Sequence, residues 1–183
     1  MKFLKITGLF ILGIVVLVLI AALLVNKKYA VEREITIKQP VSKVFNYVKL
    51  LKNQDNFSVW NQMDPTMKKT FTGIDGTVGA VAGWESENKE VGKGEQEIVS
   101  VNSNKKINFE MRFYEPQEAT GHAYFITDSL GDSLTLVKWG FYGKMSYPMN
   151  LMLVFMDMDT MLGPQLKTSL QNLKVILEKP EKR

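Results

Sequence analysis

VEREITIKQPVSKVFNYV (residues 31–48) contains a strand pattern followed at once by a helix pattern. In residues 31–37, apolar residues and Arg33 alternate with two glutamates and a threonine, which predicts a strand with one buried face. Pro40 suits the first turn of a helix, because its missing N–H has no partner there in any case. The apolar residues that follow recur at helical spacing: Val41, Val44, Phe45, Val48 and Leu51. A strand that leads directly into an amphipathic helix therefore opens the folded part of the chain.

The next part of the chain, from Lys68 to Tyr142, carries strand and turn signals. KINFEMRF (residues 106–113) is the clearest strand, because every second residue is large and apolar. Glycine-rich GIDGTVG (residues 73–79) and SLGDS (residues 129–133) indicate turns. The six predicted strands lie in KKTFTG, AVAGWES, GKGEQEIVSV, KINFEMRF, ATGHAYFITD and LTLVKWGFYG. Strands joined by short turns predict an antiparallel meander.

The last part of the chain predicts helix. YPMNLMLVFMDMDTML (residues 147–162) is apolar on almost every side, and we expect Gly163 and Pro164 to break it, with Pro164 starting the next helix. One stripe of leucines follows: Leu162, Leu166, Leu170, Leu173 and Leu177. With a second short helix in residues 56–63, the predicted fold is α+β. A curved antiparallel sheet of about seven strands wraps around a long C-terminal helix, with two short helices after the first strand.

The N-terminal segment predicts one transmembrane helix. Residues 6–25 contain Thr7 as their only polar side chain, and twenty helical residues rise about 30 Å, the thickness of a bilayer's hydrocarbon core. A cleaved signal peptide is usually shorter, and a core helix would have a polar face. We therefore expect a single-pass anchor in residues 1–28 and a folded domain in residues 29–183. The basic flanks nearly balance, and the short basic N-terminal tail favours an extracytoplasmic domain.

Charge and composition exclude several classes of function. The formal charge of +4 comes from lysines around the N-terminal segment, and from Tyr29 onward 19 basic residues face 19 acidic ones. A neutral domain lacks the basic surface of a nucleic-acid-binding protein. The chain has no cysteine and one histidine, His122, so we predict no metal site. It also lacks a Gly-x-Ser-x-Gly turn and a phosphate-binding loop, and we predict no catalytic residue and no cofactor.

Several phrases together resemble the START and polyketide cyclase/dehydrase superfamily, often called SRPBCC. They are VEREITIKQPVSKVFNYV, VWNQMDPTMKKTFTG, VGKGEQEIVSV, LVKWGFYG and YPMNLM. The resemblance covers about residues 30 to 180 and implies a helix-grip fold with a hydrophobic cavity between sheet and helix. Members of this superfamily range from lipid carriers to cyclases to chaperone activators, so the resemblance implies no single chemistry.

Large apolar residues supply the candidate ligand site. Six of the ten methionines lie within residues 145–161, and methionine suits surfaces that adapt to varied apolar shapes. Such residues at strand and helix spacing also form ordinary cores, and this alternative stays open for each of them. The predicted cavity-lining residues are Trp60, Trp84, Phe109, Met111, Phe113, Tyr124, Trp139, Phe141, Met149 and Met152.

Three functions are compatible with this sequence. The first is a membrane-tethered module that holds a lipid or other hydrophobic small molecule, with burial of apolar surface as the driving force. The second is a protein-interaction or regulatory domain, which a filled interior and a large exposed apolar patch would favour. The third is a cyclase-type enzyme that uses a cavity acid; Glu85, Glu95 and Glu97 are the candidates. Without a positioned partner for any of these acids, we do not expect an enzyme.

Overall fold

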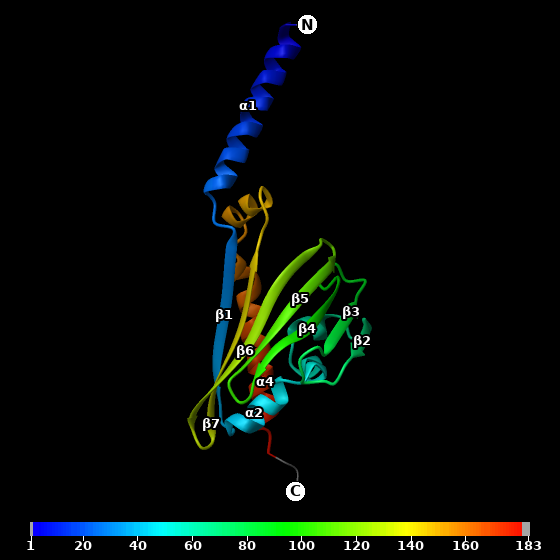
Figure 1. The fold of residues 1–183 in the computed structure, drawn as a ribbon, viewed down its shortest axis with the longest axis vertical. Helices are drawn as coiled ribbons and strands as arrows, with labels where there is room; N and C mark the ends of the chain where they lie inside the picture. Colours follow the sequence, from blue (N-terminus) through cyan, green and yellow to red (C-terminus); the bar gives the residue numbers. More distant parts are fainter. Residues whose placement is uncertain (1, 181–183) are drawn as a thin grey trace.

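The structure is a computed structural model that describes residues 2–180. A long helix, α1 (Lys2–Leu24), projects from one end of a sheet-and-helix body (Figure 1). The strands are β1 (Lys28–Ile37), β2 (Lys68–Thr72), β3 (Val81–Glu85), β4 (Lys93–Asn102), β5 (Lys106–Glu115), β6 (Ala119–Gly131) and β7 (Leu134–Lys144). The remaining helices are α2 (Val41–Val48), η1 (Leu51–Asn56), α3 (Val59–Met63), η2 (Met149–Val154) and α4 (Met158–Glu178), of which η1 and η2 are 3₁₀ helices.

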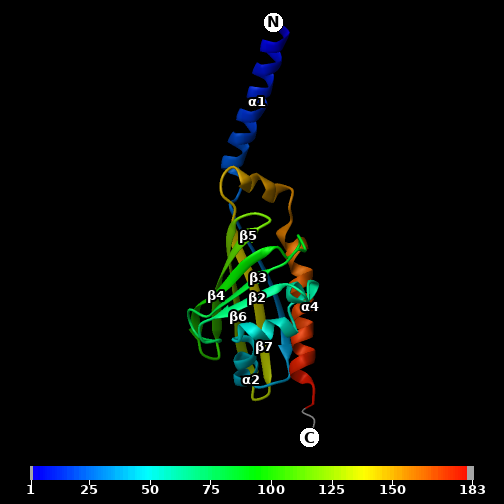
Figure 2. The same ribbon diagram turned by 90° about the vertical axis from the view of Figure 1, so that its right-hand side faces the viewer.

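The seven strands form one antiparallel sheet in the order β1-β7-β6-β5-β4-β3-β2. Strand β1 pairs with the last strand, and the others form the predicted meander. The sheet curves around α4, which runs along its inner face (Figure 2). The predicted α+β helix-grip fold, with short helices after the first strand, is confirmed.

Alternation along the strands builds the core. On β5, Ile107 and Phe109 are fully buried, while Met111 and Phe113 on the same face are only half-buried. The inner face of KINFEMRF therefore covers a packed core at one end and a more open space at the other. The leucine stripe of α4 closes the core from the other side, and its buried members are Leu166, Leu170, Leu173 and Leu177.

The start of α4 differs from the prediction. The helix begins at Met158, runs through Gly163 and Pro164, and is separated from η2 by a short turn. Asp157 caps it, because its carboxylate accepts hydrogen bonds from the Asp159 N–H at 3.0 Å and the Thr160 hydroxyl at 2.7 Å. The Asp157 cap starts the helix before Gly163 and Pro164 are reached. Pro164 then removes one backbone hydrogen bond without ending the helix.

An ion pair joins the first strand to the start of α4. The Arg33 guanidinium donates to both carboxylate oxygens of Asp159, at 2.8 and 2.7 Å. The guanidinium occupies the space beside Gly163 that a β-carbon would need. The fold therefore accommodates Arg33 among the apolar residues of β1, because its guanidinium reaches the Asp159 carboxylate at the N-terminus of α4.

The Asp159→Asn variant should lower the melting temperature at neutral pH and have no effect in acid. The hydrogen bond from Arg33 holds the pKa of Asp159 below its ordinary value of 3.8. A lowered pKa in the folded state means that the stabilisation is complete above pH 3.8 and disappears as the pH falls through the folded-state pKa. Thermal unfolding across this range checks the prediction. Asp132→Asn in the exposed β6–β7 turn is the control, and an equal shift there would contradict it.

Candidate functional site

A cavity of about 360 Å³ lies between the inner face of the sheet, the segment 51–61 and the first half of α4. The space stays open because the sheet has small side chains there: Ala82 on β3 and Ala123 on β6. Leu162 and Leu166 of α4 close the opposite side. Exposed residues of the β3–β4 and β5–β6 connections, including Glu90 and Gln117, form its rim.

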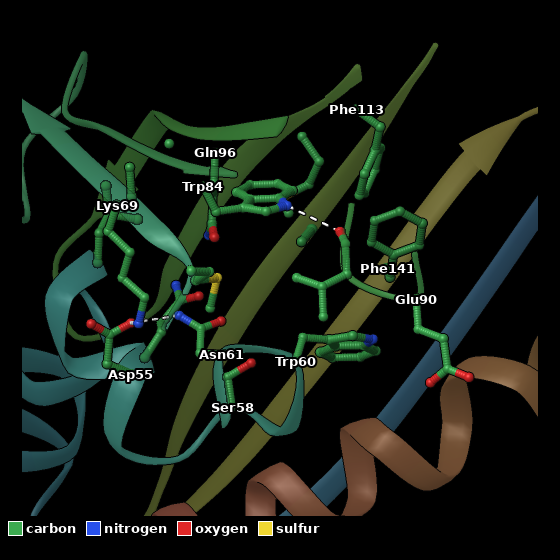
Figure 3. Close-up of a pocket in the computed structure, with 18 of the residues that line it drawn as sticks. Asp55, Ser58, Trp60, Asn61, Lys69, Trp84, Glu90, Gln96, Phe113 and Phe141 are labelled. Carbon is green, nitrogen blue, oxygen red and sulfur yellow. Dashed lines mark hydrogen bonds and ion pairs between the residues drawn. The ribbon is translucent and has the colours of Figure 1, made fainter. Parts of the chain in front are cut away.

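Aromatic rings form one wall of the cavity (Figure 3). Trp84 packs edge-on against Phe113, with ring centroids 5.9 Å apart, and Phe113 packs in turn against Phe141 at 6.3 Å. Trp60 packs in the same manner against Trp139 at 6.0 Å. These edge-to-face pairs hold the rings in fixed orientations.

The Trp84 ring is fixed by two further features of the fold. Its indole N–H donates to the Val91 carbonyl at 3.2 Å, which ties the ring to the cavity rim. Gly94, directly opposite on β4, leaves the space that the six-membered part of the indole fills. A side chain at Gly94 would push the ring out of the wall.

Polar side chains gather on the other side of the cavity, as Figure 3 shows. The Asp55 carboxylate accepts hydrogen bonds from Lys69 Nζ at 2.8 Å and Asn61 Nδ2 at 2.6 Å. Gln54 beside them is 4% exposed, and its Nε2 group has no hydrogen-bond partner among the described residues. Because an unpaired buried amide is costly, a ligand with an acceptor group that reached this donor would be favoured.

The structure places the ten predicted residues in four different environments: the cavity, the core, helix η2 and the outer face of the sheet. Six of them line the cavity: Trp60, Trp84, Met111, Phe113, Trp139 and Phe141. Phe109 is instead fully buried in the core, 6.1 Å from the ring of Phe125. Met149 and Met152 lie on η2, outside the cavity, with about 40% of their surface exposed.

Tyr124 lies on the outer face of the sheet, contrary to the prediction. Its neighbours Ala123 and Phe125 point inward, so strand alternation sends Tyr124 outward. There its hydroxyl donates to the Glu32 carboxylate, and Lys106 lies over its ring at 4.9 Å. Burial, reinforced by the hydrogen bond to Glu32, raises the pKa of Tyr124 to about 12. The Tyr124 phenol therefore stays protonated, and its contacts are on the outer face of the sheet and not in the cavity.

The three candidate acids for catalysis do not line the cavity. Glu95 and Glu97 lie on the outer face of β4, where both accept hydrogen bonds from Arg112, at 2.5 and 2.7 Å. The Arg112 bond also holds the pKa of Glu95 below its ordinary value. Glu85, at the end of β3, is bound to Lys68 and Lys93 in exposed ion pairs. The geometry thus gives no support to the cyclase hypothesis through these residues.

The polar side of the cavity was absent from the sequence prediction. Gln54, Asp55 and Asn61 come from short helices whose polar residues look solvent-exposed in the sequence. Lys69 offered a weak signal, because it is directly opposite Trp84 in the β2–β3 register and therefore shares its face. Seeing this signal requires the strand pairing, which sequence alone does not give.

Solved structures with little sequence similarity share this fold. The Aha1 dimer from Colwellia psychrerythraea matches with a TM-score of 0.58 at 13% identity, covering 84% of this chain and 99% of that one. Norcoclaurine synthase from Thalictrum flavum, in complex with dopamine and hydroxybenzaldehyde, gives 0.61 at 13% identity, covering 87% and 92%. Major latex-like protein 151 from Panax ginseng gives 0.58 at 14% identity, covering 84% and 100%.

These neighbours have folds of the Bet v 1/SRPBCC type, and at such identities the similarity establishes the fold alone. No family model matches the chain, and no curated protein does. The expected helix-grip architecture therefore stands on the structure and on these neighbours together.

Proposed function

We propose that this protein is a membrane-anchored binding protein that holds a small amphiphile in the cavity between its sheet and α4. The observation that carries the proposal is the cavity itself, with aromatic rings on one side and the unpaired Gln54 amide on the other. Its volume of about 360 Å³ lies within the range of small-molecule sites. An apolar ligand body would lie against Trp84 and Phe113, and an acceptor group of the ligand would accept from Gln54.

Helix α1 supports the membrane part of the proposal. Lys5–Leu24 has a mean hydropathy of 3.0, and almost none of it is buried against the rest of the protein. A core helix of this composition would be covered, so the exposed apolar surface of α1 requires another apolar environment. We propose that α1 is retained as a single-pass anchor, with the body on the extracytoplasmic side as the basic N-terminal tail favours.

The structural neighbours are compatible with this function. Norcoclaurine synthase was solved with two small aromatic molecules, dopamine and hydroxybenzaldehyde, on the same fold. We extend from this only the class of ligand, a small molecule with an apolar part and a polar group. Asp55 and Lys69 of the cavity wall are paired with each other, so we propose binding and not a reaction.

Native mass spectrometry of the full chain, isolated in nanodiscs from its own membranes, tests the proposal. The parent protein should carry an extra mass that organic solvent releases. Gln54→Met keeps the size of the side chain and removes the donor, so occupancy by the same ligand should fall about tenfold. The melting temperature of the ligand-free protein should stay constant or rise, because an unpaired buried amide is gone. A parent protein without extra mass that also excludes apolar fluorescent probes would sink the proposal.

A further inference from the structure

The segment around η2 is the longest uncharged stretch outside α1. Residues 145–156 contain no charged side chain, and several of their apolar side chains face outward. The exposed members are Tyr147, Met149, Met152, Val154 and Phe155. Phe155 is 83% exposed, and so large an exposed fraction is unusual for a phenylalanine in a folded domain. We call residues 145–156 the η2 segment.

The η2 segment is hydrogen-bonded to the end of α1. The buried Asn150 side chain donates from Nδ2 to the Ala22 carbonyl at 2.7 Å and to the Val25 carbonyl at 3.0 Å. The Tyr147 hydroxyl donates to the Leu19 carbonyl at 3.2 Å. The last carbonyls of a helix have no partners within it, so Asn150 supplies a cap that α1 lacks. These bonds fix α1 to the body instead of leaving it on a free linker.

The same bonds set the depth of the segment relative to a bilayer. Leu19 lies five residues before the end of α1 at Leu24, which is about 7.5 Å along a helix axis. The Tyr147 ring therefore lies beside the last turn and a half of α1. If α1 spans the bilayer, this level is the boundary between headgroups and acyl chains, where tyrosine is enriched and amphipathic segments bury their apolar sides.

Positive charge surrounds this end of the body. Lys28 and Lys144 are directly opposite each other at the open end of the β1–β7 ladder. Lys27 lies over the Tyr147 ring, 5.9 Å from its centre. Lysines next to an exposed apolar segment fit a surface with phosphate groups outside and hydrocarbon beneath. A protein partner would have to match both features while leaving room for the bilayer around α1.

We propose that the η2 segment is a second membrane-binding element, which rests in the headgroup–acyl boundary and fixes the orientation of the body through Asn150. This inference rests on the proposed function, because it requires α1 to span the membrane. Both views place η2 at the α1 end of the body (Figures 1 and 2). The β3–β4 and β5–β6 connections, which form the cavity rim, lie toward the same end of the sheet. The cavity entrance thereby comes close to the membrane surface.

Spin labels on single cysteines test the inference, since the chain has no cysteine of its own. Full-length Phe155→Cys, Ile14→Cys and Leu130→Cys would be labelled in nanodiscs of phosphatidylcholine with a minority of phosphatidylglycerol, one copy per disc. Leu130 is exposed near the end of strand β6, at the far end of the body, and Ile14 lies in the middle of α1. The ratio of collisions with oxygen to collisions with a water-soluble nickel complex reports depth.

We expect the ratio at Phe155 to exceed that at Leu130 several-fold and to remain below that at Ile14. Adding Asn150→Ala should lower the ratio at Phe155 and leave Ile14 unchanged, because only the docking is released. A Phe155 label as accessible to nickel as Leu130, with Ile14 still deep, would overturn the inference and leave the anchor intact. A Phe155 label shielded from both oxygen and nickel would indicate a protein contact and overturn it as well. A shallow Ile14 would overturn the anchor itself.

Discussion

The Phe57→Ala variant should unfold with a free energy about 3–5 kcal/mol lower than that of the parent protein, the usual cost of removing a buried phenylalanine. Phe57 is fully buried between η1 and α3. Its ring packs edge-on against Trp139 at 5.7 Å and Phe125 at 6.2 Å, which brings the short helices onto the sheet. Its carbonyl accepts from Asn172 of α4, so one residue joins the three layers of the fold.

Urea titration in detergent, followed by tryptophan fluorescence, measures this loss because Trp139 is part of the same cluster. Ile74→Ala is the control: a large apolar side chain is again cut back to alanine, but this one is exposed and lies outside the η2 segment. It should change the free energy of unfolding by less than about 0.5 kcal/mol. Equal losses in the two variants would mean that the Phe57 cluster does not hold the layers together.

The Ala82→Phe variant should weaken ligand binding, with at least about a tenfold loss of affinity for an apolar probe, equivalent to about 1.4 kcal/mol. Ala82 lies on the inner face of β3, next to Gln96 of β4 and Phe71 of β2 in the strand register. Its methyl group is part of the cavity wall. A benzyl group in its place would enter the space between the aromatic and polar sides without removing a core side chain.

Val81→Phe is the control for this substitution. Val81 is the adjacent residue of the same strand, and alternation sends its side chain to the outer face, opposite Glu97. Fluorescence titration with an apolar probe should show parent-like affinity for Val81→Phe and loss for Ala82→Phe. If Ala82→Phe binds as well as the parent protein, the ligand lies elsewhere, and the cavity is a packing defect.

The two membrane features and the cavity are independent in these experiments. Ala82→Phe should leave the depth of a Phe155 label unchanged, since β3 is next to the edge strand β2 and the η2 segment is bonded to α1. Conversely, Asn150→Ala should leave the affinity for a soluble apolar probe unchanged, because Asn150 is not among the cavity-lining residues. Binding and docking can therefore be separated by substitution.

Much of the fold followed from local patterns. The alternation in residues 31–37 and 106–113 predicted strands, the leucine stripe predicted the helix that the sheet grips, and the turns predicted the meander. These patterns are local because strand and helix periods repeat over a few residues. The alternation also determines which residues of β6 share a face, and the prediction of Tyr124 overlooked this. Ala123 and Phe125 face inward, so Tyr124 between them faces outward.

The sequence by itself determined the seven-stranded helix-grip architecture and the apolar helix that precedes it, because both follow from hydrophobic periods and lengths. Only the tertiary structure decided where the interior stays empty and where α1 is bound. The cavity exists because alanines of β3 and β6 meet rings from α3, β5 and β7, and Gln54 lines it from η1, which is far in sequence from β5, β6 and β7. Likewise, the Asn150 cap joins residues more than a hundred positions apart. Such contacts depend on which side chains the fold brings together, and no local period records them.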